Sequence, residues 1–201
     1  GDGARTSCRS SYGARRHGRM PHLCTMAKNA NERMDQAFAA LLSEEDAKVL
    51  GALAYVQSHG DARAILPLLH ALARTADVQR QQRIQAMLFE VKVKDAADEL
   101  IKALDMPALR SVRTTVLAAF WNAGLDAAPH TEKLIACAVE GSADECFECL
   151  TVLEHQEVLP EKAVLKGIRT VSDAIATNTD DYKGAMLGGL LVELKARVGR
   201  S

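Results

Sequence analysis

Aromatic side chains are scarce in this 201-residue sequence, where Phe, Trp and Tyr together make up 4 % and Trp occurs once. This scarcity argues against an all-β sandwich, whose strands are rich in aromatic residues, and against a protein that stacks nucleotide bases. No apolar run approaches the roughly 18 residues that would span a bilayer, so we expect no membrane partner. What remains is an Ala- and Leu-rich chain with 48 % apolar residues, a composition typical of helical proteins with a buried core.

Cysteine is also sparse, and five scattered cysteines do not suggest a disulfide framework. The first residues lack the apolar segment of a secretory signal, so we expect a reducing, cytoplasmic setting. Cys146 and Cys149 form a C-x-x-C pair near Cys137, but the pair lies within a predicted helix rather than in a metal-binding knuckle. We interpret these cysteines as small buried apolar residues, and we expect no metal and no cofactor.

Residues 1–30 differ in composition from the rest of the chain. They carry six Lys or Arg and one acidic residue, which leaves 19 basic and 25 acidic residues in 31–201, a net charge of −6. Three interpretations of this basic, Gly-, Ser- and Arg-rich leader remain open: a disordered or non-native segment, a functional basic tail, or an organelle-targeting segment. We therefore expect one helical domain over 31–201, too acidic to suggest nucleic-acid binding.

From residue 31 onward, apolar residues recur with helical spacing, and no segment alternates as a strand would. After a first helix through Met34 and Leu42, the pattern predicts helices over 44–58, 61–74, 77–91, 95–105, 107–123, 128–140, 143–156, 160–176 and 180–198. The short connections favour antiparallel neighbours. Side chains that could cap helix N-termini are those of Ser43, Asp61, Asp95, Asp126 and the capping-box pair Ser142 and Glu145.

An internal repeat runs through these helices. The segment 68–72 (Leu-Leu-His-Ala-Leu) recurs in similar form at 100–104, 134–138 and 164–168, a period of about 32 residues. Such a period is typical of stacked two-helix units, each of which needs its neighbours to bury its apolar face.

One stretch resembles a known repeat family. The pattern from Val112 and Arg113 through Phe120 and Trp121 to Gly124 and Asp126 is similar to the HEAT-like repeat of the phycobilisome-lyase type. The resemblance extends in pattern over about 140 residues and is sharp only between about 95 and 126. It implies an all-α fold, a short right-handed α-solenoid of about five antiparallel helix pairs, and no particular activity.

The second helices of the units carry the candidate partner-binding residues, which are Arg80, Arg83, Arg110, Thr114, Leu117 and Trp121. At 100° per residue, Trp121 lies opposite Val112 on its helix, with Leu117 and Arg110 near it. Two alternatives follow. Trp121 belongs to a second apolar face packed on a neighbouring helix, or it is an exposed anchor together with Leu117 and Arg110.

Together these features predict a non-enzymatic scaffold or adaptor that binds another protein through the concave wall of second helices. We expect no catalytic residue, because the chain has neither a phosphate-binding loop nor a metalloprotease motif. One alternative, implied by the resemblance, is an accessory protein in enzyme or cofactor chemistry. A weaker alternative is a HEAT-like DNA-repair protein, for which the acidic body is a poor match.

Overall fold

The computed structural model describes the backbone of residues 21–199 and the side chains of residues 29–199. This range contains ten α-helices and three short 3₁₀ helices and has no strand, which confirms the predicted all-α class. The chain forms two units, residues 1–33 and residues 34–201. Residues 1–20 of the predicted leader lie outside the described residues, and residues 21–30 belong to the first helix.

The helices follow the predicted order with short connections. They are α1 (Pro21–Leu41), α2 (Asp46–His59), η1 (Ala62–Ala64), α3 (Ile65–Arg74), α4 (Val78–Phe89), α5 (Ala96–Leu104), η2 (Pro107–Val112), α6 (Arg113–Ala123), η3 (Ala128–His130), α7 (Thr131–Glu140), α8 (Ala143–Glu154), α9 (Glu161–Thr177) and α10 (Asp181–Arg197). Three of the predicted helices, 61–74, 107–123 and 128–140, begin with a 3₁₀ turn. Pro occupies the first or second position of the turns at 107 and 128.

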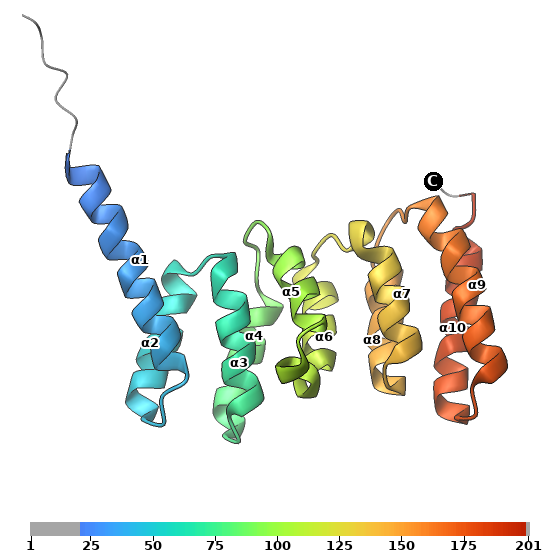
Figure 1. Cartoon of the computed structure of the whole chain (residues 1–201), viewed down its shortest axis with the longest axis horizontal. Coiled ribbons are helices and arrows are strands. Elements are labelled where there is room, and N and C mark those ends of the chain that lie inside the picture. Colours follow the sequence, from blue (N-terminus) through green and yellow to red (C-terminus); the bar gives the residue numbers. More distant parts are fainter. Residues whose placement is uncertain (1–20, 200–201) are drawn as a thin grey trace, which may run out of the picture. The chain divides into compact units, whose positions relative to one another are not determined.

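Neighbouring helices of the second unit pack in consecutive pairs, α3 with α4, α5 with α6, α7 with α8 and α9 with α10 (Figure 1). The second helices also pack on one another from pair to pair, α4 on α6, α6 on α8 and α8 on α10. Among the first helices, α3 packs on α5 and α7 on α9. Helix α6 therefore contacts α4, α5 and α8, and its side chains meet neighbours on several sides.

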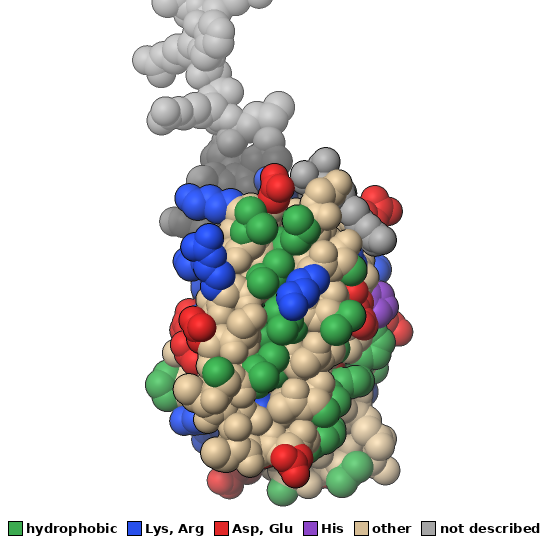
Figure 2. Space-filling view, turned by 90° about the vertical axis from the view of Figure 1, so that its right-hand side faces the viewer, with side chains coloured by type: hydrophobic (Ala, Val, Ile, Leu, Met, Phe, Trp, Pro, Cys, Tyr) green, Lys and Arg blue, Asp and Glu red, His purple; other side chains and the backbone are tan. Residues whose placement is uncertain are grey.

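One apolar cluster runs through the second unit. Its largest fully buried side chains include Leu53, Leu69, Leu100, Phe120 and Leu187, and they come from both members of the helix pairs. Burying each such side chain contributes about 1.5–3 kcal/mol, so this cluster is the main source of stability. The outer face of α9 and α10 also shows apolar side chains between Lys and Arg residues (Figure 2), and Leu165 and Val192 are among the exposed apolar residues of these two helices.

The predicted helix caps are confirmed at two starts and wrong at three. Ser142 and Glu145 form the capping box of α8, and Asp61 accepts the backbone N–H of Arg63 at the start of η1. Asp126 accepts the N–H of Ala128 but lies one residue before the N-cap of η3, which is Ala127. Asp95 lies in the left-handed region with φ 66° and makes no capping bond. Ser43 accepts from the N–H of Glu45, ahead of the first turn of α2, so it does not cap that helix.

Three cations bind the C-terminal ends of helices other than their own. Lys183 of α10 donates to the carbonyls of Val139 and Gly141, both at 2.6 Å, at the end of α7. Lys92, in the loop after α4, donates to the carbonyl of Ala123 at the end of α6. Arg197 of α10 donates to the carbonyls of Leu153 and Glu154 at the end of α8. A cation at this end donates to carbonyls that have no partner within the helix, and its positive charge is stabilised by the negative end of the helix dipole.

Candidate functional site

The six predicted partner-binding residues do not form one surface. Leu117 is 0 % exposed and lies in the core, so its assignment to a binding surface is wrong. Arg80 of α4 forms an ion pair with Asp46 of α2, and Arg83 lies half-buried on α4. Arg110 lies in η2 and Thr114 in the first turn of α6, whereas Trp121 lies near the C-terminal end of α6. The structure thus separates Arg110 and Thr114 from Trp121.

Trp121 is half-buried and packs against the core, and its indole N–H reaches α8. Its indole Nε1 donates to Glu148 Oε2 at 2.8 Å. Its ring lies 5.8 Å from the His155 ring, centroid to centroid, at a tilt of 33°. The two alternatives for Trp121 are therefore both partly met: the residue packs on a neighbouring helix and also presents part of its surface.

His155 extends this aromatic site at the end of α8. Its Nδ1 lies 2.7 Å from the carbonyl oxygen of Thr151, one turn earlier. A carbonyl only accepts, so Nδ1 carries the proton, and in the neutral ring Nε2 is left as an acceptor. The exposed His155 ring therefore offers a partner both an aromatic face and a polar atom.

An open depression of about 770 Å³ lies beside Trp121 and His155. Its lining is mixed, with apolar Leu125, Pro129 and Val158 next to acidic Asp126 and Glu157. Gly124, whose backbone is in the left-handed region (φ 63°), ends α6, and the chain after it runs along the edge of the depression. Such a wide, mixed depression accommodates a loop or side chains of another protein better than it encloses a small molecule.

Gln156 fixes the floor of this depression. Its side chain is nine-tenths buried, and its Oε1 accepts the N–H of Ala127 at 2.9 Å. Its Nε2 donates to the carbonyl of Val152 at 3.2 Å and to that of Leu125 at 3.4 Å. Periodicity alone does not pair Gln156, Glu148 or His155 with their partners, because those partners lie about 30 residues away in the sequence.

A second cleft lies at the opposite end of α6. Arg110 and Thr114 line it together with Glu140, Gly141 and Glu145, and its volume is about 470 Å³. A Cβ at Gly141 would lie 2.2 Å from Glu145 Oε2 and 2.7 Å from the Cys137 carbonyl oxygen, so only glycine leaves room for the Glu145 carboxylate. That carboxylate accepts the Ser142 N–H at 2.7 Å and faces Arg113.

Buried thiols lie behind this cleft. Cys137, Cys146 and Cys149 are all buried, as predicted. Arg113 Nη2 donates to Cys137 Sγ at 3.0 Å. The hydrogen bond from Cys149, followed by the charge of Arg113, lowers the pKa of Cys137 to about 7. Burial raises the pKa of Cys146 to about 11, so Cys137 and Cys146 differ strongly in acidity.

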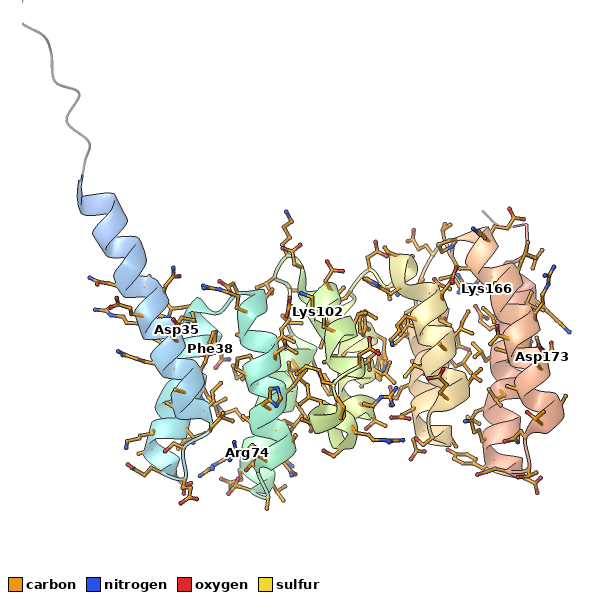
Figure 3. The ribbon with its side chains drawn as sticks, in the orientation of Figure 1. Asp35, Phe38, Arg74, Lys102, Lys166 and Asp173 are labelled. Atoms are coloured by element: carbon orange, nitrogen blue, oxygen red, sulfur yellow. The ribbon has the colours of Figure 1, made fainter. Side chains whose placement is uncertain are left out.

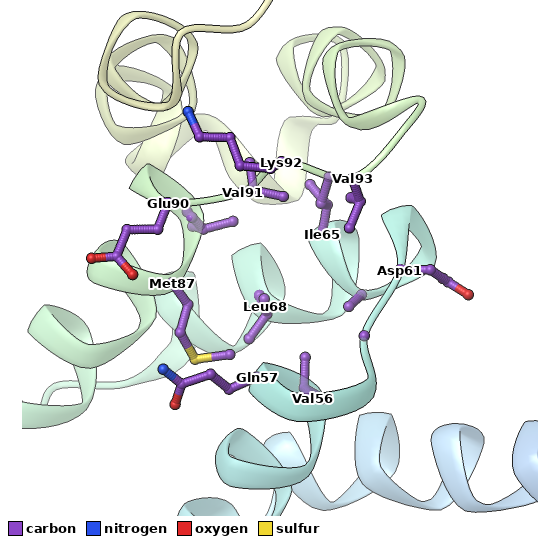
Figure 4. Close-up of a pocket in the computed structure, with 13 residues that line it drawn as sticks. Val56, Gln57, Asp61, Ile65, Leu68, Met87, Glu90, Val91, Lys92 and Val93 are labelled. Carbon is purple, nitrogen blue, oxygen red and sulfur yellow. The ribbon is translucent and has the colours of Figure 1, made fainter.

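A smaller apolar cavity of about 200 Å³ lies between α2, α3 and the end of α4 (Figure 4). Ile65, Leu68 and Met87 are among its lining residues, and Gln57 and Glu90 bring polar groups to it. Its volume is below the roughly 300–1,000 Å³ that is typical of small-molecule sites.

Within residues 29–199, no group of three or more His, Cys, Asp or Glu side chains is placed to hold a metal ion. In the part of the chain that the structure describes, no helix is both long and apolar enough to cross a membrane.

Comparison of the chain with protein-family models, with curated proteins and with solved structures gave no match.

Proposed function

We propose that the second unit is a short right-handed α-solenoid of about five antiparallel helix pairs with HEAT-like repeats, and that it acts as a non-enzymatic scaffold in the cytoplasm. Its partner is another protein, bound by the second helices, and the anchor of that interface is Trp121 with His155 beside it.

Contacts between units recur at the repeat period, and this regularity supports the solenoid. Many polar contacts that join one helix pair to the next span 27–34 residues of sequence, whereas that of Arg113 with Cys137 spans 24 residues and those of α10 with the ends of α7 and α8 span 40–44. The former include Gln85 to Thr115, Lys92 to Ala123, Asp98 to His130, Trp121 to Glu148, Ala127 to Gln156, and Glu132 to Lys166, the last at 2.5 Å with Lys166 labelled in Figure 3. Separations that cluster near the repeat period of about 32 residues are what stacked units produce.

The aromatic pair at the open depression is the observation that carries the binding proposal. Trp is enriched among residues that dominate binding energy, and a half-buried Trp whose N–H is already satisfied loses little on contact with a partner. Trp121 meets both conditions through its bond to Glu148 and its packing on the core. The acidic rim residues Asp126 and Glu157 favour a partner with basic side chains at this position.

Site-directed photo-cross-linking tests this proposal in cells of the native host. A photoreactive phenylalanine analogue replaces the exposed Val158, which lines the depression, or the exposed Leu165 of α9, a first helix, as the matched position outside it. We expect another protein to be cross-linked from position 158 and not from position 165. Adding Trp121→Ala abolishes this cross-link, and adding Tyr182→Ala, an exposed aromatic of α10, leaves it unchanged.

Two results would contradict the binding proposal. One is the absence of any protein cross-linked from position 158. The other is equal cross-linking with and without Trp121→Ala, with circular dichroism showing the same helix content in both chains.

A further inference from the structure

The last helix pair, α9 and α10, lies at one end of the second unit and leaves one face without a neighbouring pair (Figure 1). In the pair before it, Ile135 of α7 is only 2 % exposed because α9 packs over it, where a Cβ at Gly167 would collide with Ile135 Cδ1. Leu165 occupies the equivalent position of the sequence repeat in α9 and is 44 % exposed. The last pair therefore exposes a position that the preceding pair buries.

This outer surface of the last pair, here called the end face, is mainly apolar (Figure 2). Leu165 and Ile168 lie one turn apart on α9, and Gly188, Leu191 and Val192 lie within about one turn of each other on α10. Val192 is 70 % exposed, the largest value among the exposed apolar residues. A terminal pair in a repeat protein usually has a polar outer surface, because exposed apolar surface promotes association. The end face thus has the chemistry of an interface.

Two opposite charges flank Gly188 on α10. Asp181 lies seven residues before it and Lys195 seven residues after it, and a step of seven residues returns to the same side of a helix within about 20°. Both charged side chains are exposed, and within residues 29–199 neither forms an ion pair. No atom of another described helix lies within 4 Å of the position that a Cβ would take at Gly188. An acid and a base are therefore placed at equal distances from an uncrowded glycine.

We propose that the end face binds a second copy of this chain about a two-fold axis that passes beside Gly188. This axis reverses the direction of α10, so α10 of the two copies runs antiparallel and crosses at Gly188. Asp181 of each copy then faces Lys195 of the other, and the two ion pairs flank the crossing. Because glycine has no Cβ, the two backbones approach closely at this point.

Charge complementarity favours a second copy as the occupant of the end face. A two-fold contact between antiparallel helices requires each acid to be matched by a base at the same distance from the axis, and Asp181 and Lys195 meet this condition. A shallow crossing of about 20° keeps both ends of the helices within reach. The same rotation lays α9 over α9 of the other copy, so Leu165 and Ile168 are covered together with Val192.

The size of the end face determines the expected affinity. A helix of 17 residues, the length of both α9 and α10, is about 25 Å long, and two such helices side by side are about 20 Å wide. Each copy therefore buries about 500 Å² and the dimer about 1,000 Å², which is near the lower limit for a specific interface. We expect a weak dimer with a Kd of about 10–100 µM.

Sedimentation equilibrium of the full chain under reducing conditions tests the proposal, with Asp181→Lys and Lys195→Asp as the variants. Each substitution alone places like charges opposite each other at both ends of the crossing, so each variant should dimerise at least about tenfold more weakly than the wild type. An equimolar mixture of the two variants restores both ion pairs between unlike copies. We therefore expect the mixture to dimerise with a Kd within about threefold of the wild-type value.

Three outcomes of these measurements would overturn the proposal. The first is a wild type that stays monomeric at about 200 µM, which would leave a different protein or residues 1–20 of the same chain as the occupant. The second is a mixture that dimerises no better than its two components, with circular dichroism showing wild-type helix content in both. The third is growth beyond the dimer, because a two-fold contact closes on itself.

Gly188→Gln gives an independent measurement that changes no charge. A side chain at this position has room in the single chain but separates the two backbones in the dimer, so dimerisation should weaken at least about tenfold. Gly51→Gln on α2 is the matched control, because a Cβ there also meets no atom within 4 Å, and it should dimerise as the wild type does. Equal dimerisation of the Gly188→Gln and Gly51→Gln chains would place the contact elsewhere and overturn the proposal.

Discussion

Arg197 of α10 donates through Nη2 to the carbonyl of Leu153 at 3.3 Å, across 44 residues of sequence. The same guanidinium reaches Glu154 O at 3.1 Å and Gln156 O at 2.5 Å, and it pairs with Glu193 Oε1 at 2.6 Å. Its side chain is therefore the cap of α8, supplied by another helix. Carbonyls at a helix end otherwise depend on water, so this contact ties α10 to α8.

Arg197→Ala should lower the free energy of unfolding by about 2–3 kcal/mol, because charge-assisted hydrogen bonds to shielded carbonyls are lost together. Urea denaturation followed by circular dichroism measures the change. Arg169→Ala, at an exposed position of α9, is the matched control and should shift stability by less than about 0.5 kcal/mol. Equal losses in both variants would show that Arg197 is not a cap.

Leu117 and Trp121 lie one turn apart on α6 and should respond differently to truncation. Leu117→Ala creates a cavity at a fully buried position and should cost about 2–5 kcal/mol of stability. Trp121→Ala should cost less, because Trp121 is half-buried and keeps part of its surface in solvent. Thermal melting of both variants gives the comparison. A larger loss for Trp121→Ala would assign Trp121 to the core rather than to a binding surface.

Gln156→Ala removes the acceptor for the buried Ala127 N–H and the donor to Leu125 and Val152. A buried group left without its partner costs about 1–3 kcal/mol, so we expect a loss in that range. Amide hydrogen exchange should also become faster at Ala127. Gln82→Ala on the exposed side of α4 should change neither quantity. Unchanged exchange at Ala127 in Gln156→Ala would contradict the bridging role.

Cys137 should make stability depend on pH. Its pKa is about 7 in the folded chain, because Cys149 and Arg113 favour the thiolate, and about 8.5 in an unfolded chain. A lowered folded-state pKa makes ionisation favour folding. This contribution is therefore complete above the unfolded value and is lost as the pH falls through 7.

Urea denaturation under reducing conditions checks this dependence. The stability difference between the wild type and Cys137→Ala should grow as the pH rises from about 6 to about 8.5. At higher pH the unfolded forms of Cys146 and Cys149 ionise, and their raised folded-state pKa values then reduce stability in both chains. A stability difference that stays constant between pH 6 and 8.5 would show that Cys137 keeps its proton in the folded chain.

Periodicity and end signals in the sequence were sufficient to predict the order of the helices. The capping box of Ser142 and Glu145 marks the start of α8 in both the prediction and the structure. The grouping of Arg110, Leu117 and Trp121 failed for a geometric reason. Arg110 lies in a 3₁₀ turn, where each residue advances about 120° rather than 100°, so angles counted through this turn are wrong for α6.

The partners of Trp121 were beyond prediction for another reason. Its contacts to Glu148 and His155 depend on how far α8 is shifted along α6, and helical spacing within one segment carries no information about that shift. Asp95 was misassigned because an Asp before a helix is also suited to the left-handed conformation that it adopts here.

Lys183 and Arg197 both come from the last helix, yet they complete the ends of α7 and α8. During synthesis, α7 and α8 leave the ribosome before α10 does. Until α10 follows, the carbonyls at their C-terminal ends lack the donors that Lys183 and Arg197 provide. A chain that stopped before Lys183 would release both helices in that unfinished state. The ends of α7 and α8 are therefore completed only after α10 has been synthesised.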